Sequence, residues 1–135
     1  MVPSSSRDFQ RAAAQRLTTA EFLLDHRYNL DAMYLAGYAV ECSLKALILK
    51  VVQVQEHNQM LKKVTSGSRM HEPETLGAIL KELQHPIPLD LVKRLRRSQW
   101  STNLRYQTHR PDTGETRAFL KTAKAAYDWV EGQLS

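Results

Sequence analysis

The sequence predicts an all-α fold: an antiparallel, up-and-down bundle of about five helices that forms a single domain over residues 1–135. Apolar residues recur at helical spacing in several long segments. Proline, glycine and capping residues separate these segments, and no run of residues indicates a strand. A chain of 135 residues is large enough for one hydrophobic core and too small for two. We therefore expect one helical domain.

The composition is that of a soluble globular protein, with 42% hydrophobic and 24% charged residues. The first residues lack a hydrophobic signal region, and charges at Glu41, Lys45 and Lys50 interrupt the longest apolar run. A cytoplasmic protein without a membrane segment is therefore expected. The single cysteine, Cys42, excludes an internal disulfide and a cysteine-based zinc cluster. The histidine spacings are not those of a metal site, so no metal or cofactor is expected.

The first helix is expected from about Ser6 to His26. Its apolar residues recur at spacings of four, four, three and four, which is typical of a core-facing stripe: Phe9, Ala13, Leu17, Ala20 and Leu24. Ser5, with Asp8 three residues later, is a variant of the capping box. Because only a short break separates this helix from the next, the two should lie antiparallel.

The segment from Leu30 to Val52 predicts the central helix of the bundle, because it is apolar around most of its circumference. Its polar residues form one line at spacings of four, three and four: Tyr34, Tyr38, Glu41 and Lys45. Glu41 and Lys45 must pair with each other or with a ligand, because an unpaired buried charge is costly. The line is therefore either a structural ion pair beside two phenols or a polar binding site in a cleft.

The helical pattern degrades between Gln53 and Arg69, where Ser66-Gly67-Ser68 indicates a flexible loop. A third helix is expected to start near His71, with Pro73 in its first turn, where the missing N–H does no harm. Two further prolines, Pro86 and Pro88, should end this helix.

A fourth, short helix is expected from about Leu89, and it opens a cationic stretch. This stretch contains six basic residues and no acidic one: Lys93, Arg94, Arg96, Arg97, Arg105 and Arg110. A local field of this sign suits phosphate groups. The structural alternative is the solvated face of a short helix.

The segment from Ser98 to Thr113 has no clean period and carries two large aromatics, Trp100 and Tyr106. We expect an ordered loop that packs over the polar line of the central helix. Trp100 is then either part of the core or a platform for a base. The last helix should begin after Asp112, with Glu115 three positions on as its capping partner.

Several of these segments together resemble the HEPN family of helical domains. The resemblance is carried by RAAAQRLTTAEFLLDHRYNLDAMYLAGYAVECSLKALI, by the His near the third helix, by Trp-x4-Arg-Tyr at 100–106, and by AKAAYDWVEGQL at the end. Its most specific part is the Glu-x3-Lys motif of Glu41 and Lys45. The resemblance implies a helical bundle, dimerisation and a role with nucleotides or RNA. It also implies a small nucleotidyltransferase partner, as in toxin–antitoxin pairs.

Family members that cut RNA resemble one another in an Arg and a His separated by four to six residues. The nearest pair here, Arg105 and His109, has three residues between them. We therefore expect a homodimeric binding module without the usual nuclease motif, acting with a nucleotidyltransferase partner. Its nucleotide or RNA phosphate would contact seven residues: Tyr34, Tyr38, Glu41, Lys45, Arg97, Trp100 and Tyr106.

The alternative is a metal-independent ribonuclease toxin. In that hypothesis His109 transfers protons and Arg105 stabilises charge on the phosphate during cleavage. Comparing RNA decay for the protein and a His109→Ala variant separates the two hypotheses.

Overall fold

Helices account for most of the residues that the structure describes. The computed structural model describes residues 3–98, 100, 104, 106 and 111–135. Within that part of the chain there are six α-helices, two longer 3-10 turns and no strand. In chain order they are α1 (Ser6–Asp25), α2 (Asn29–Val51), η1 (Val54–Glu56), α3 (His57–Val64), η2 (Ser68–His71), α4 (Pro73–Glu82), α5 (Leu89–Ser98) and α6 (Thr113–Leu134). The all-α prediction is confirmed.

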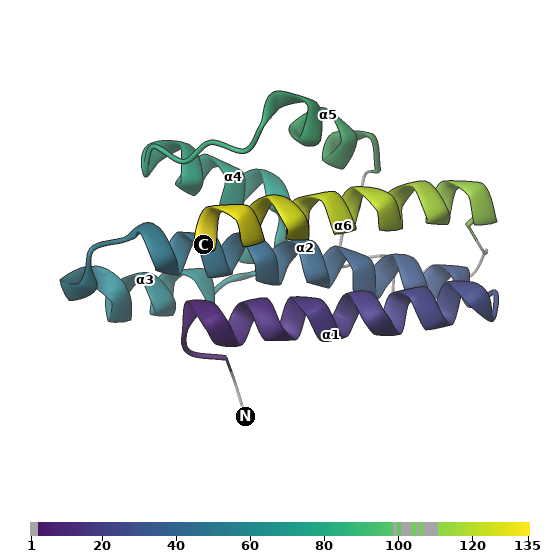
Figure 1. Cartoon of the computed structure of the whole chain (residues 1–135), viewed down its shortest axis with the longest axis horizontal. Coiled ribbons are helices and arrows are strands. Elements are labelled where there is room, and N and C mark those ends of the chain that lie inside the picture. The colour runs from purple at the N-terminus through teal and green to yellow at the C-terminus, as the bar shows by residue number, and fades with distance from the viewer. Residues whose placement is uncertain (1–2, 99, 101–103, 105, 107–110) are drawn as a thin grey trace.

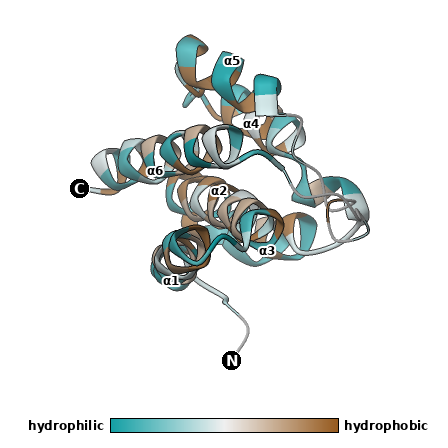
Figure 2. Cartoon of the chain, turned by 90° about the vertical axis from the view of Figure 1, so that its right-hand side faces the viewer, coloured by the Kyte–Doolittle hydropathy of each residue, from teal (hydrophilic) through white to brown (hydrophobic). Residues whose placement is uncertain are grey.

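The long helix α2 forms the centre of the bundle. It packs between α1 and α6, and α4 and α3 also contact it (Figures 1 and 2). Fifteen of its 23 residues are buried, so it presents apolar surface to several neighbours at once. Short helix α5 lies further out and packs on α6. This arrangement confirms the central position that the sequence predicts for this segment.

By length and composition alone, α2 is apolar enough to cross a membrane, although the sequence analysis took its charges to exclude this. The structure gives the physical reason for its apolar character. Of the residues in its most apolar window, 78% are buried inside the fold. The apolar surface of α2 therefore belongs to the core of the bundle.

Both helix caps predicted from the sequence are present. The Ser5 hydroxyl accepts a hydrogen bond from the Asp8 backbone N–H at 3.1 Å, and the Asp112 carboxylate accepts one from the Glu115 N–H at 3.2 Å. The short connection between α1 and α2 makes them antiparallel, as predicted (Figure 1). The buried amide of Asn29 then donates to the Pro111 carbonyl at 3.0 Å, which ties the start of α2 to the start of α6.

Helix α3 was not predicted from the sequence. It lies inside the segment 53–69, where the helical pattern of apolar residues degrades. Of its eight residues, Val64 is the buried one, while Met60 and Leu61 are half-buried. A helix of two turns with so little buried surface gives too short a periodic signal to detect.

Trp100 packs directly on α2 at Gly37. The indole is 8% exposed, and a Cβ added at position 37 would overlap its ring. The ring centroid also lies 6.1 Å from that of Tyr34 and 5.5 Å from that of Tyr38. Glycine inside a helix is destabilising, and here it allows the tryptophan to lie against the helix backbone. Trp100 therefore anchors the chain after α5 to the polar line of α2.

Gly37→Ala should destabilise the protein although alanine is the better helix former. The added methyl group must displace the Trp100 ring, and overpacking of this kind costs about 1–3 kcal/mol. Chemical denaturation measures the change, and tryptophan fluorescence should shift to the red as Trp100 becomes exposed.

The matched control is Gly132→Ala in α6, where an added Cβ has no atom within 4 Å. This variant should be as stable as the original protein or up to about 1 kcal/mol more stable. Equal stability of the two variants would contradict the packing of Trp100 on Gly37.

Candidate functional site

The predicted polar line exists along one side of α2. The hydroxyl groups of Tyr34 and Tyr38 lie 3.0 Å apart, one turn from each other. One turn further on, the Lys45 ammonium donates to Glu41 Oε2 at 2.7 Å. These four residues thus lie along one side of the helix, as their spacings of four, three and four predict. Trp100 joins the two phenols from the segment after α5, so five of the nine predicted site residues lie together.

Glu41 and Lys45 form a buried ion pair. Their side chains are only 7% and 5% exposed. The second carboxylate oxygen, Oε1, lies 3.0 Å from Nδ1 of His71 in η2, so each oxygen of Glu41 has a partner. Burying a carboxylate is costly unless it is paired and hydrogen-bonded. The two partners of Glu41 supply this compensation.

His71 is the accessible partner of Glu41 in this cluster, because its side chain is 41% exposed. A ligand that approaches from solvent would meet His71 and the half-buried phenols of Tyr34 and Tyr38 before the Lys45 ammonium. The charges of Glu41 and Lys45 cancel each other inside the fold. The outer edge, formed by the imidazole and the two phenols, is thus the part of the cluster that a ligand can reach.

The thiol of Cys42, the neighbour of Glu41 in the chain, is held in its protonated form at neutral pH. Burial raises the pKa of its thiol to about 11, and the negative charge of Glu41 contributes in the same direction. The thiolate is the reactive form of cysteine. Cys42 therefore packs as a small apolar residue beside the polar line.

Four further residues were predicted for the site. Arg97 is exposed on α5, and Tyr106 is 71% exposed in the segment that follows. Arg105 and His109, the candidate catalytic pair, lie outside the described residues. Among the described residues, the two oxygens of Glu41 have Lys45 and His71 as their partners.

Two residues of the cluster were not predicted as site residues. Gly37 carried a signal, because a lone glycine inside an apolar helix, flanked by tyrosines, indicates close approach of another group. His71 was noted as part of the family resemblance, but no local pattern indicated its contact with Glu41, since it lies 30 residues away and only the fold brings the two together.

A second candidate surface lies on α5. Lys93 and Arg97 are exposed and one turn apart, which places them on the same side of the helix. The neighbouring Arg96 pairs with Glu74 of α4 at 3.3 Å, and both side chains are largely exposed, at 66% and 75%. Exposed ion pairs of this kind contribute only about 0–1 kcal/mol. Arg96 can therefore exchange its carboxylate partner for another anion at little cost.

A comparison with protein families finds one that covers nearly the whole chain. The model described as HEPN domain matches residues 6–133. No curated protein and no solved structure matches the chain. The family match therefore rests on the sequence pattern and agrees with the helical fold described above.

Glu41→Gln should destabilise the protein strongly. It leaves the Lys45 ammonium buried without a negative partner, and breaking a buried pair in this way costs about 3–5 kcal/mol. Urea unfolding measures the loss.

The control is Asp128→Asn, which breaks an ion pair of the same spacing on the surface of α6, where Lys124 and Asp128 lie 2.8 Å apart with side chains 53% and 58% exposed. This change should cost no more than about 0.5 kcal/mol. Similar losses in the two variants would show that Glu41 is not a buried charge partner.

Proposed function

The chain belongs to the HEPN domain family, and from this premise we propose that it is a homodimeric module that binds the phosphate groups of RNA or nucleotides. HEPN domains are helical modules with a nucleotide- or RNA-related role, and they commonly bind RNA and dimerise. The proposal assigns the phosphate contacts to particular surfaces of this chain. The protein is then a binding module, and it lacks the Arg–His spacing of family members that cut RNA.

The observation that carries this proposal is the cationic outer side of α5. Lys93, Arg96 and Arg97 are exposed within five residues, and the acidic residue of this helix, Asp90, lies in its first turn. Arginine offers a planar, two-pronged contact to phosphate oxygens, and lysine a point charge. A short helix with this density of accessible cations suits the backbone of a nucleic acid.

The polar line of α2 is close to the end of this helix. Only one residue separates the end of α5, Ser98, from Trp100, whose ring packs against the phenols of Tyr34 and Tyr38. Two steps of chain span at most about 7 Å. A strand of RNA on Arg97 can therefore continue toward the phenols and His71, while Glu41 and Lys45 hold these groups in place from within the core.

The dimer and the partner are further parts of the proposal. Two aromatic side chains near the junction of α1 and α2 are exposed, Phe22 in the last turn of α1 at 59% and Tyr28 in the connection at 56%, which supports a surface for self-association. A monomer in sedimentation at tens of micromolar would contradict this part. A small nucleotidyltransferase partner, in a toxin–antitoxin-like system, is proposed from the resemblance to family members with such partners.

Removing two exposed cations from α5 should weaken RNA binding and reduce its dependence on salt. For Lys93→Gln/Arg97→Gln, the slope of log affinity against log salt should fall by about 1.4, because each phosphate contact with a single strand contributes about 0.7. Titration of single-stranded RNA at several salt concentrations gives this slope.

The control variant is Lys62→Gln/Lys63→Gln, which removes the same charge from exposed positions on α3, a helix that packs on α2 rather than near α5. Its salt slope should stay close to that of the original protein. If the two double variants lose the same slope, binding depends on net charge alone and the assignment to α5 is wrong.

A further inference from the structure

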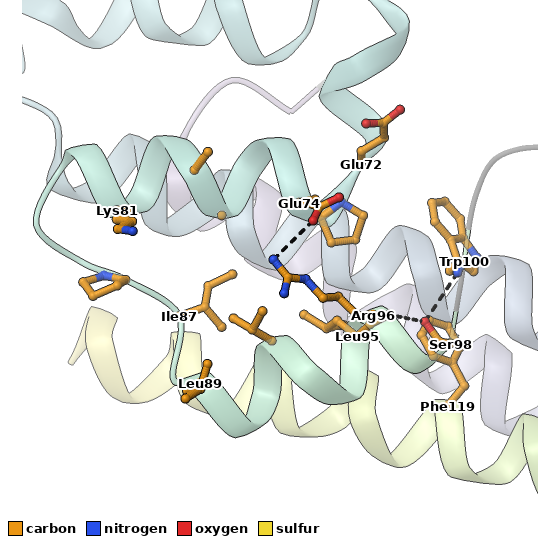
Figure 3. A pocket seen from close by; sticks show the side chains of 15 residues that line it. Glu72, Glu74, Lys81, Ile87, Leu89, Leu95, Arg96, Ser98, Trp100 and Phe119 are labelled. Carbon is orange, nitrogen blue, oxygen red and sulfur yellow. Dashed lines mark hydrogen bonds and ion pairs between the residues drawn. The ribbon is translucent and has the colours of Figure 1, made fainter.

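A cavity of about 680 Å³ lies between α4 and α5 (Figure 3). Most of its wall is apolar and comes from four parts of the chain, including Gly77 and Ala78 of α4, Val92 and Leu95 of α5, and Trp100 and Phe119. Folded domains pack their interiors closely, whereas ligand sites have volumes of about 300–1,000 Å³ and mainly apolar walls. The size and lining of this cavity are therefore those of a ligand site.

The two ends of the cavity differ in chemistry. Trp100 and Phe119 lie at the end next to Ser98, and Ile87 and Leu89 lie at the other end (Figure 3). The absence of a side chain at Gly77 leaves space between α4 and Ile87, because an added Cβ would lie only 3.2 Å from Ile87 Cδ1. Trp100 and Phe119 are only 8% and 4% exposed, so a ring system at this end would contact the small part of each aromatic side chain that faces the cavity.

Among the described residues that line the cavity, the charges cancel one another. They are two carboxylates, Glu72 and Glu74, and two cations, Lys81 and Arg96. A neutral body therefore suits the interior better than a charged one, because a buried charge would lack a counter-charge. The ion pair between Glu74 and Arg96 bridges α4 and α5 beside the cavity (Figure 3).

Helix α5 joins this neutral cavity to the cationic surface described above. Val92, Leu95 and Arg96 line the cavity, and the adjacent Lys93 and Arg97 are exposed outside it. A ligand with a neutral ring and a phosphate matches both sides of this helix. We infer that the cavity between α4 and α5 holds a nucleobase, while the attached phosphate takes Arg96 from Glu74. This inference rests on the proposed function and adds the site of the base.

The first test uses Trp100 as a reporter at the site. The chain contains two tryptophans, so Trp129→Phe leaves Trp100 as the sole fluorophore of this type. Titration with adenosine should change its emission, and adenosine 5′-monophosphate should do so at lower concentration because Arg96 adds a phosphate contact. Ribose 5-phosphate, which has no base, should leave the emission unchanged.

Ala78→Leu tests the cavity itself. Ala78 is an exposed residue in the α4 wall, and a larger side chain there fills the space for the ring with little effect on the fold. Binding of adenosine 5′-monophosphate should weaken about tenfold or more. The control is Ala118→Leu, an exposed alanine of α6 that is not part of the wall, and its affinity should match that of the original protein.

Glu74→Gln gives a prediction of opposite sign. It removes the carboxylate that competes for Arg96, so affinity for the monophosphate should rise while affinity for adenosine stays the same. A general structural role of Glu74 would not raise affinity for one ligand alone. A short adenosine oligonucleotide, added to the complex with the monophosphate, then distinguishes the sources of the base. Displacement of the monophosphate supports an unstacked RNA base, and failure to displace it supports a free nucleotide.

The inference is overturned if adenosine and its monophosphate leave Trp100 emission unchanged, or if Ala78→Leu and Ala118→Leu bind alike. Failure of the base site is distinguishable from failure of the proposed function. If only the base site is wrong, the cavity experiments are negative, but the Lys93/Arg97 variant still shows a smaller dependence of RNA affinity on salt. If the proposed function is wrong, the salt dependence of that variant matches that of the Lys62/Lys63 control.

Discussion

The buried carboxylate of Glu41 is the constraint on which the arrangement of this bundle depends. A carboxylate at this depth needs partners for both oxygens, and it finds one within its own helix, Lys45 at 2.7 Å, and one from η2, His71 at 3.0 Å. The second contact ties η2 to α2. Because Pro73 starts α4 two residues after His71, the same contact fixes where α4 leaves the surface of the central helix.

A second contact on the same line of α2 places the other half of the proposed site. Trp100 packs on Gly37 between the two tyrosines and follows the end of α5 by two residues. His71 and Trp100 therefore connect α4 and α5, respectively, to neighbouring turns of one helix. The cavity between α4 and α5 and the cations outside it are both positioned by the polar line, whose own charged pair is buried. In this account the line supports the ligand surface from within.

Much of the fold could be predicted from sequence because long helices carry many periodic positions. The segments of α1, α2, α4, α5 and α6 have apolar stripes, caps or proline signals that mark them individually. Helix α3 has a single buried residue, Val64, so its period could not be recognised. The polar line of α2 was predictable for the same reason as the helices, since its spacing depends on local geometry alone.

The partners of that line could not be predicted, because they depend on how distant segments pack. His71 lies 30 residues from Glu41, and the cavity takes its wall from α4, α5, α6 and Trp100 together. Gly37 was the local signal available, as a glycine inside an apolar helix indicates that another group approaches. Family resemblance added the expected class of ligand, and the structure of the described residues places accessible cations for it on α5.

A double-mutant cycle between Glu41 and His71 tests the central constraint most directly. The free energy of unfolding is measured for Glu41→Gln, His71→Gln, the double variant and the original protein. If the carboxylate joins η2 to α2, the two effects are coupled by about 1 kcal/mol or more, as for residues in one hydrogen-bond network. Additivity within about 0.3–0.5 kcal/mol would show that Glu41 and His71 act independently, and would contradict the account of how α4 is positioned.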